Sequence, residues 1–109
     1  MSAPDGGPVE DGDVAGGDVA NELARCRAEI ERIDAAIVEL LARRMALGRR
    51  TGALKREAGM PILDPTREAA VIRRATTLAR DAGIAPEAVR EVFWQIVGMS
   101  RRAQEDTRA

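Results

Sequence analysis

The stretch that decides the fold is residues 21–58, NELARCRAEIERIDAAIVELLARRMALGRRTGALKREA. Its apolar side chains recur at alternating steps of three and four residues, the spacing of one face of an α-helix. They are Leu23, Cys26, Ile30, Ile33, Ile37 and Leu40, with Leu41 and Leu47 flanking the stripe. Gly59-Met60-Pro61 follows, and a glycine with a nearby proline ends helices. The pattern therefore predicts one long helix from about Asn21 or Glu22 to about Ala58.

Two shorter helices are predicted downstream. Asp64 is placed to cap a helix that begins at Pro65, continues to about Ala82 and ends before Gly83. Pro86 starts another helix, which runs to about Gln104. The expected buried faces are Val71, Ile72, Ala75, Leu78 and Ala79 on the first of these helices, and Val89, Phe93, Ile96 and Val97 on the second. No strand pattern appears, so the sequence predicts an all-α fold of three helices.

Residues 1–21 differ from the rest in composition. They hold five of the ten glycines, two of the five prolines and five of the 18 acidic residues, but none of the 17 basic residues. A segment of this kind buries too little apolar surface to offset the entropy that it loses on ordering. We therefore expect residues 1–21 to form a disordered acidic leader and residues 22–109 to form one helical domain.

Composition argues against several kinds of site and partner. One cysteine and no histidine argue against a disulfide framework, a metal site and histidine-based acid–base catalysis, so no metal is expected. No cofactor is expected either. No apolar run is long enough to span a membrane, and the acidic N-terminus does not read as a secretory signal, which predicts a cytoplasmic protein. The only aromatic residues are Phe93 and Trp94, so a stacking platform for nucleic acid is lacking.

The length of the first helix bears on assembly. A helix of about 37 residues is roughly 55 Å long, whereas a compact domain of this size has a radius of gyration near 13 Å. The two shorter helices can cover only part of it, which would leave much of its apolar stripe in water. A two-fold homodimer is the simplest arrangement that covers such a stripe.

Several polar residues stand where the helical stripes predict apolar ones. Arg44 continues the stripe of the long helix, and Lys55 shares its face about 16 Å further along. Ser100 and Gln104 continue the stripe of the last helix. Each has an ordinary alternative: long basic side chains can extend their heads to water, and the last turn of a helix can fray. Together, however, these residues predict a donor-rich pocket for an anionic ligand.

Two further features of the sequence leave alternatives open. In the turn that contains Asp64, Arg67 and Glu68, the carboxylates can serve a ligand or can simply cap the helix and complement its dipole. Gly48 and Gly52 weaken the long helix by roughly 1 kcal/mol each relative to alanine. They indicate a close backbone approach, a packed ligand or a tolerated weakness.

Taken together, residues 22 to about 105 resemble the all-helical chorismate mutases of the AroQ class. The resemblance rests on eight positions: Arg27 in CRAEIERID, Arg44 in ELLARRMAL, Lys55 in GALKREAG, Asp64, Arg67 and Glu68 in PILDPTRE, and Ser100 and Gln104 in VGMSRRAQ. It implies an intertwined all-α homodimer with two active sites, each of which takes Arg27 from the other subunit. The helix geometry supports this, because Arg27 lies roughly 25 Å from Arg44 along the axis, too far to share one small ligand within a subunit.

The resemblance also implies a reaction that needs neither histidine nor metal. Chorismate, a dianion, rearranges to prephenate in one pericyclic step without proton transfer, so the enzyme supplies posture and electrostatics. By resemblance, Arg27 and Arg44 clamp the carboxylates, with Ser100 and Arg67 in support. Lys55 and Gln104 stabilise the charge that develops on the ether oxygen. Glu68, with the backbone at Asp64, reads the C4 hydroxyl.

Alternatives remain open at this point. The 4-amino-4-deoxychorismate mutases of antibiotic pathways share the fold and the rearrangement, and Glu68 could pair with their C4 ammonium group. Isochorismate pyruvate-lyases fit less well, because their loop differs at the positions of Asp64 and Glu68. A non-catalytic helical dimerisation module is a further alternative, and a pathway enzyme that activates this one is a possible partner.

Overall fold

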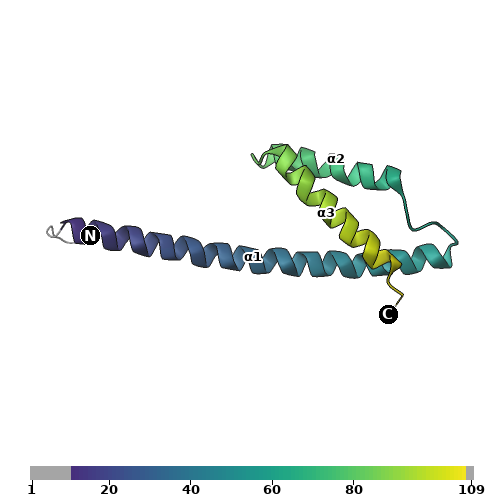
Figure 1. Ribbon diagram of the computed structural model, residues 1–109, viewed down its shortest axis with the longest axis horizontal. Coiled ribbons are helices and arrows are strands. Elements are labelled where there is room, and N and C mark those ends of the chain that lie inside the picture. The colour runs from purple at the N-terminus through teal and green to yellow at the C-terminus, as the bar shows by residue number, and fades with distance from the viewer. Residues whose placement is uncertain (1–10, 108–109) are drawn as a thin grey trace. The chain divides into compact units, whose positions relative to one another are not determined.

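The computed structural model describes the backbone of residues 11–107 and the side chains of residues 16–107. Within that range it contains three α-helices and no strand (Figure 1). The helices are α1 (Asp11–Glu57), α2 (Pro65–Asp81) and α3 (Pro86–Glu105). The predicted all-α class and the number and order of the helices are confirmed.

The chain divides into two compact units, Met1–Val38 and Glu39–Ala109. In the first unit, the described residues belong to the N-terminal part of α1. The second unit contains the rest of α1 together with α2 and α3. The fold that matters for a binding site is that of the second unit.

Helix α1 begins earlier than the sequence predicts. It starts at Asp11 rather than near Asn21, so residues 11–21 of the expected disordered leader are helical. Extending an existing helix fixes only one residue for each hydrogen bond gained, so a weak helix-forming segment can join a strong one. The first ten residues of the expected leader lie outside the described residues.

The other helix ends agree with the sequence to within one residue. Helix α1 ends at Glu57, and Gly59 follows with a left-handed φ of 68°. Met60 N–H then donates to the Lys55 carbonyl at 2.8 Å, which satisfies a carbonyl of the last turn. At the start of α2, the Asp64 side chain accepts from Arg67 N–H at 3.1 Å, and Pro65 is the first helical residue.

Helices α2 and α3 pack against each other through a small core. Its buried apolar residues, among those described, are Ile72, Ala75 and Ala79 of α2 and Val97 of α3. The prediction that Leu78 is buried is wrong, because its side chain is 51% exposed. Leu78 lies about 100° around the helix from Ala79, at the edge of the face that meets α3, where it lines a pocket with Phe93.

The apolar stripe of α1 is largely uncovered in the single chain. Ile30, Ile33, Ile37, Leu40 and Leu47 are each at least half exposed, and Leu47 reaches 67%. Cys26, expected as a small buried residue of this stripe, is also exposed. A single chain therefore leaves most of the stripe in water, as the helix lengths predict.

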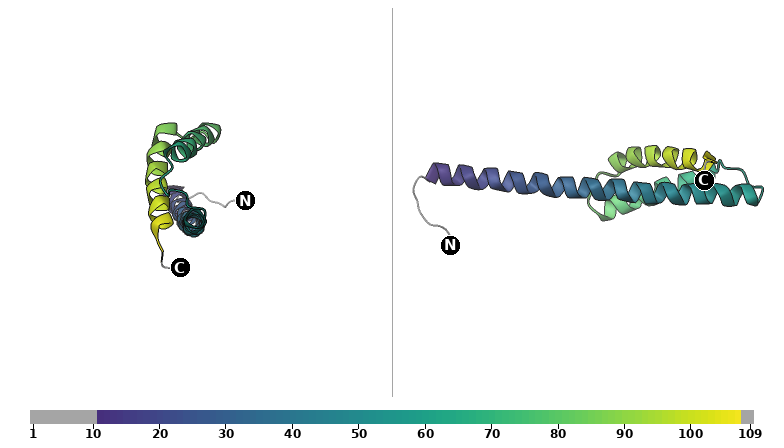
Figure 2. Two further views of the ribbon diagram at one scale, coloured as in Figure 1. Left: turned by 90° about the vertical axis from the view of Figure 1, so that its right-hand side faces the viewer. Right: turned by 90° about the horizontal axis from the view of Figure 1, so that it is seen from below.

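Helix α3 returns along the second unit towards the end of α1. In Figures 1 and 2 the last turns of α3 lie beside the part of α1 that precedes its C-terminus. Contacts between Lys55 and Gln104 connect the two segments. In the part of the chain that the structure describes, no helix is both long and apolar enough to cross a membrane.

Candidate active site

A polar pocket of about 430 Å³ lies within the second unit. Seven of the eight residues singled out from the sequence line it: Arg44, Lys55, Asp64, Arg67, Glu68, Ser100 and Gln104. They come from α1, from the turn before α2 and from the two helices that follow. The remainder of the lining includes Leu47, Val71 and Val97. The pocket therefore combines charged and hydrogen-bonding groups with a smaller number of apolar side chains.

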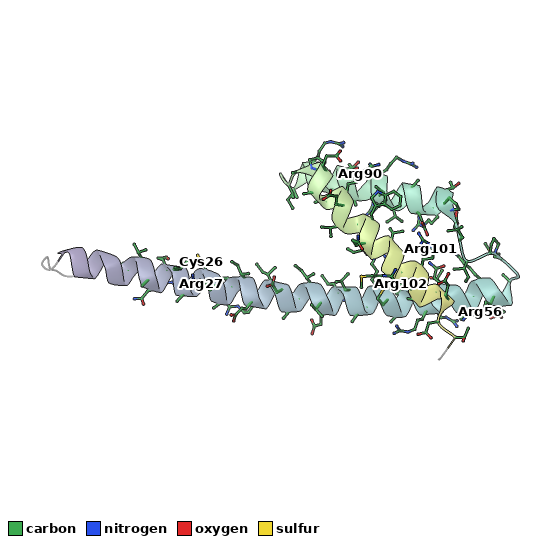
Figure 3. The ribbon with its side chains drawn as sticks, in the orientation of Figure 1. Cys26, Arg27, Arg56, Arg90, Arg101 and Arg102 are labelled. Carbon is green, nitrogen blue, oxygen red and sulfur yellow. The ribbon has the colours of Figure 1, made fainter. Side chains whose placement is uncertain are left out.

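The eighth residue, Arg27, belongs to the other unit. It lies on the N-terminal part of α1, where its side chain is exposed (Figure 3). The structure thus gathers seven of the eight residues from one chain and leaves the position of Arg27 relative to a ligand as a prediction.

Lys55 is the best-fixed cation of the pocket. Its Nζ donates to the Ile62 carbonyl at 2.9 Å and to Gln104 Oε1 at 2.8 Å. An ammonium group has three protons, so one remains to donate to a ligand. Since an ammonium cannot accept a hydrogen bond, the contact also fixes the orientation of the Gln104 amide, whose Nε2 group keeps both of its protons. Two donors, one charged and one neutral, thus stand together.

The close approach of α3 to α1 depends on two glycines of α1. A Cβ atom added to Gly52 would lie 2.7 Å from the Cα of Gln104 and closer still to its carbonyl oxygen. A Cβ atom on Gly48 would lie 3.3 Å from Ser100 Oγ and from the Ser100 carbonyl oxygen. Of the readings that the sequence leaves open, the structure supports a close backbone approach. Both glycines thus allow residues of the predicted site, Gln104 and Ser100, to lie close to α1.

Arg56 holds the end of α3 from outside the pocket. Its Nη1 donates to the Gln104 carbonyl at 2.9 Å. This carbonyl lies in the last turn of α3, where backbone acceptors lack partners within the helix. The backbone of Gln104 is thus bound by Arg56 while its side chain is bound by Lys55. In the sequence, Arg56 stands out only as a basic residue in the last turn of α1, where it interacts favourably with the helix dipole.

Glu68 is held by Arg101, a residue that the sequence analysis does not single out. Arg101 Nε donates to Glu68 Oε2 at 2.9 Å, and Arg101 Nη2 donates to Glu68 Oε1 at 2.7 Å. The arrangement is a two-pronged charge-assisted contact between α3 and α2. The Glu68 side chain is 17% exposed and that of Arg101 is 35% exposed. Figure 3 shows Arg101 on the last turns of α3.

One signal in the sequence could have identified Arg101. It stands four residues after Val97, on the continuation of the apolar stripe of α3, where a charge is unexpected. Among the described residues, the ion pair of Glu68 is with Arg101 and not with neighbouring Arg67. Arg67 is exposed, lines the pocket and contributes its backbone N–H to the Asp64 cap.

The surroundings of Glu68 favour its ionised form. The hydrogen bonds from Arg101 lower the pKa of Glu68 below its usual value. Partial burial raises this pKa, and the charges of Arg101 and Lys55 lower it further, against a smaller opposing effect of Asp64. The pKa of Arg101 is correspondingly raised by the same contact. Glu68 is therefore a charged acceptor, not a proton donor, at neutral pH.

The charge of the lining suits an anion. Three cations, Arg44, Lys55 and Arg67, face two carboxylates, Asp64 and Glu68, one of which is already paired with Arg101. The pocket with its supporting residue is thus net positive. Among the described residues, no group of three histidine, cysteine or acidic side chains is placed to hold a metal ion. The arrangement can bind and polarise an anionic ligand with donors on several sides.

Comparison with known proteins gives relatives of which this chain covers very different shares. A 4-amino-4-deoxychorismate mutase of Streptomyces venezuelae is 38% identical over 64 residues, 59% of this chain and 62% of the relative. A T-protein of Enterobacter agglomerans is 31% identical over 85 residues, 78% of this chain but 23% of the relative. A chorismate mutase of Methanocaldococcus jannaschii is 27% identical over 84 residues, 77% of this chain and 85% of the relative.

The lengths of these relatives limit what is carried over. The chain spans about a quarter of the T-protein and somewhat under two thirds of the Streptomyces enzyme. The family comparison concerns the helical domain itself. Residues 26–105, which include all eight positions singled out from the sequence, match the family described as chorismate mutase type II. The chain therefore belongs to the chorismate mutase type II family of isomerases.

Proposed function

We propose that the pocket binds chorismate and catalyses its rearrangement to prephenate. The observation that carries the proposal is the pairing of Lys55 with Gln104 at 2.8 Å on the wall of a net positive pocket. This pair presents one ammonium proton and an amide NH₂ group to whatever the pocket holds. Family membership supplies the reaction, and the pocket supplies groups of the kind that this reaction requires.

The reaction breaks a C–O bond and forms a C–C bond within one molecule. Negative charge develops on the ether oxygen in the transition state, so donors that are already aimed at this atom stabilise the transition state more than the substrate. In the proposed assignment, Lys55 and Gln104 are these donors. Because neither must transfer a proton, the reaction needs no general acid or base.

Posture is the second requirement. The substrate must hold its enolpyruvyl arm over the ring, and cations on both carboxylates favour that conformation. We assign one carboxylate to Arg44, with Arg67 and Ser100 in support, since all three line the pocket. Glu68, with the backbone at Asp64, is assigned to the C4 hydroxyl.

The second carboxylate is assigned to Arg27 of the partner subunit in a homodimer. The support is the exposed apolar stripe of α1, which a second copy of the chain would cover. A dimer with antiparallel long helices would also bring Arg27 from one subunit towards Arg44 of the other. The proposal thus joins the oligomeric state to the completeness of the site.

The test is turnover by the purified full-length chain. Loss of ultraviolet absorbance is followed after the protein is added to chorismate, and the product is identified by mass spectrometry. Formation of prephenate is the expected result. An absence of turnover, together with unchanged thermal stability in the presence of chorismate, would contradict the proposal and favour a non-catalytic helical dimerisation module.

A second candidate substrate is 4-amino-4-deoxychorismate. It is favoured by the 38% identity to the Streptomyces venezuelae enzyme of that name. The rearrangement is the same, and only the group at C4 differs. The same assay with this compound, run in parallel, separates the two candidates through the ratio of their kcat/KM values. A pathway enzyme that activates this one would appear as a rise in kcat when it is added.

A further inference from the structure

Glu68, the residue assigned to the C4 group of the substrate, is itself bound by a second residue, Arg101. Glu68 lines the pocket, whereas Arg101 is not among the described side chains that line it. Arg101 contacts both carboxylate oxygens of Glu68, at 2.9 and 2.7 Å. The contact connects α3 to the first turn of α2, across 33 positions of the sequence. Arg101 therefore does not contact a ligand in the pocket directly, and it bears on the ligand through its contact with Glu68 and through its charge.

This contact leaves Glu68 with a defined capacity. An ionised carboxylate can accept about four hydrogen bonds, and Arg101 uses one on each oxygen. The remaining lone pairs can accept from a donor in the pocket. Because Glu68 stays ionised, it cannot itself donate, so the C4 group that it recognises has to be a donor.

The charge of Glu68 is, however, already compensated. A hydroxyl group at C4 needs only an acceptor, which the paired carboxylate still provides. An ammonium group at C4 needs an uncompensated negative charge, and here it would meet the guanidinium of Arg101 across a single carboxylate. The like charges repel at close range in a partly desolvated pocket, where this repulsion is larger than in water. Lys55, on the same pocket wall, adds to the repulsion.

We infer that Arg101 is a specificity-determining positioning residue, which biases the site towards a neutral C4 hydroxyl group and against a C4 ammonium group. The inference rests on the proposed function and goes beyond it, because it chooses between the two candidate substrates. It also predicts how the choice can be altered, by removal of one charge that does not touch the substrate.

The experiment compares kcat/KM for chorismate and for 4-amino-4-deoxychorismate in the full-length chain and in Arg101→Gln. The wild-type protein is expected to prefer chorismate. In Arg101→Gln, this preference is expected to fall about tenfold or more, mainly through a lower KM for the amino substrate. Arg101→Lys, which keeps the charge, is expected to retain most of the preference.

The matched control is Arg102→Gln. Arg102 neighbours Arg101, carries the same charge and is exposed on α3 away from the pocket, so its replacement is expected to leave the substrate ratio unchanged. Arg101→Met also removes the charge with a side chain of similar length. If Arg101→Gln does not fold, the substrate ratio is measured in Arg101→Met instead.

Two outcomes would overturn the inference alone. One is a wild-type preference for the amino substrate. The other is an equal loss of activity on both substrates in folded Arg101→Gln and Arg101→Met, which would make the contact merely structural. If the wild-type protein turns over neither substrate, the proposed function fails, and the inference fails with it.

Discussion

At the scale of single residues, Lys55 provides the clearest separation of catalysis from structure. Lys55→Ala removes the only ammonium group that is fixed on the pocket wall, and we expect kcat/KM to fall by about a hundredfold or more. The two hydrogen bonds that it loses are partly exposed, so the free energy of unfolding should fall by only about 1 kcal/mol. Steady-state kinetics and urea unfolding measure the two effects.

Arg50→Ala is the control for this variant. Arg50 is exposed on the same helix and does not line the pocket, so its loss should leave the rate unchanged. A dimerisation module would tolerate both substitutions alike. Equal activity of Lys55→Ala and the wild-type protein would therefore remove Lys55 from the mechanism.

If Gln104 is the donor to the ether oxygen, as proposed, the pH dependence of the reaction follows from its chemistry. Its amide donates without first taking up a proton, so kcat/KM should be nearly constant from about pH 6 to pH 8. Gln104→Glu places a carboxyl group beside Lys55, and that group can donate only when it is protonated. The activity of this variant should fall as the pH rises over the same range. A steep acid-side change in the wild-type protein would argue against Gln104 as the ether donor.

The place of a residue in the site can be predicted from the sequence when it depends on helical periodicity, but not when it depends on how two helices pack. Lys55 and Gln104 stand on helical stripes, so their places in a pocket follow from periodicity and from the order of the helices. The pairing of Glu68 with Arg101 does not follow, because it depends on how α2 and α3 are placed relative to each other. The sequence does not specify how α2 and α3 are placed relative to each other. It indicates only that a charged residue at position 101, on an apolar stripe, needs a partner.

At the scale of helices, Gly52 decides how closely α3 can approach α1. In Gly52→Ala the added Cβ meets the backbone of Gln104, which cannot move without shifting its side chain. We expect a loss of about 1–3 kcal/mol in stability from overpacking, partly offset by the better helix propensity of alanine, and at least a tenfold loss of activity. Thermal unfolding and kcat/KM measure these effects.

Two other glycines provide a graded comparison. Gly48→Ala brings a Cβ atom to 3.3 Å from Ser100, so its effects should be smaller than those of Gly52→Ala. Gly17→Ala meets nothing within 4 Å and should stabilise the helix by up to about 1 kcal/mol. Similar behaviour of all three variants would mean that the close approach at Gly52 has no role in positioning Gln104.

The contact between α2 and α3 through Glu68 makes stability depend on pH in the acid range. The folded state lowers the pKa of Glu68 below its ordinary value of 4.5, mainly through the hydrogen bonds from Arg101, with Lys55 assisting and Asp64 opposing. The contribution is thus present above about pH 4.5 and is lost as the pH falls through the lower, folded-state pKa.

The measurement is the difference in unfolding free energy between the wild-type protein and Glu68→Gln. It should be constant well above pH 4.5 and should shrink as the pH falls below 4.5, because the carboxyl group of the unfolded state then takes up its proton before that of the folded state. Glu91→Gln, at an exposed position of α3, is the control for a general loss of negative charge. A difference that does not change with pH would show that the ionised form of Glu68 contributes nothing to stability.

The helices themselves are the most predictable level of this fold. Pro65 with the Asp64 cap, Pro86, Gly59 and Gly83 mark their ends, because each residue has a backbone preference that acts locally. The start of α1 is the exception. Composition predicts disorder for residues 11–21, whereas a neighbouring strong helix can extend into such a segment, and this coupling is not visible in a local count of residues.

At the scale of the whole molecule, the uncovered stripe of α1 is the feature that a single chain does not explain. The described core of one chain contains four buried apolar residues, while seven large aliphatic residues of α1 are half exposed or more. Burying such side chains contributes about 1.5–3 kcal/mol each, so a second copy that covers them would add several kcal/mol of stability. Stability and activity should therefore depend on protein concentration.

A shared site in a dimer makes a prediction that no monomeric enzyme can satisfy. Arg27→Ala and Lys55→Ala should each be inactive as pure proteins, because every site then lacks one group. When the two are mixed and exchange subunits, half of the dimers are mixed, and one of their two sites combines an intact pocket with an intact Arg27. Activity should therefore return to about a quarter of the wild-type value.

Mixing Lys55→Ala with Gln104→Ala is the control. Lys55 and Gln104 serve the pocket of their own subunit, so in a mixed dimer one site lacks Lys55, the other lacks Gln104, and no intact site can form. If Arg27→Ala with Lys55→Ala stays as inactive as that control after subunit exchange is verified by mass spectrometry, Arg27 does not act across the interface.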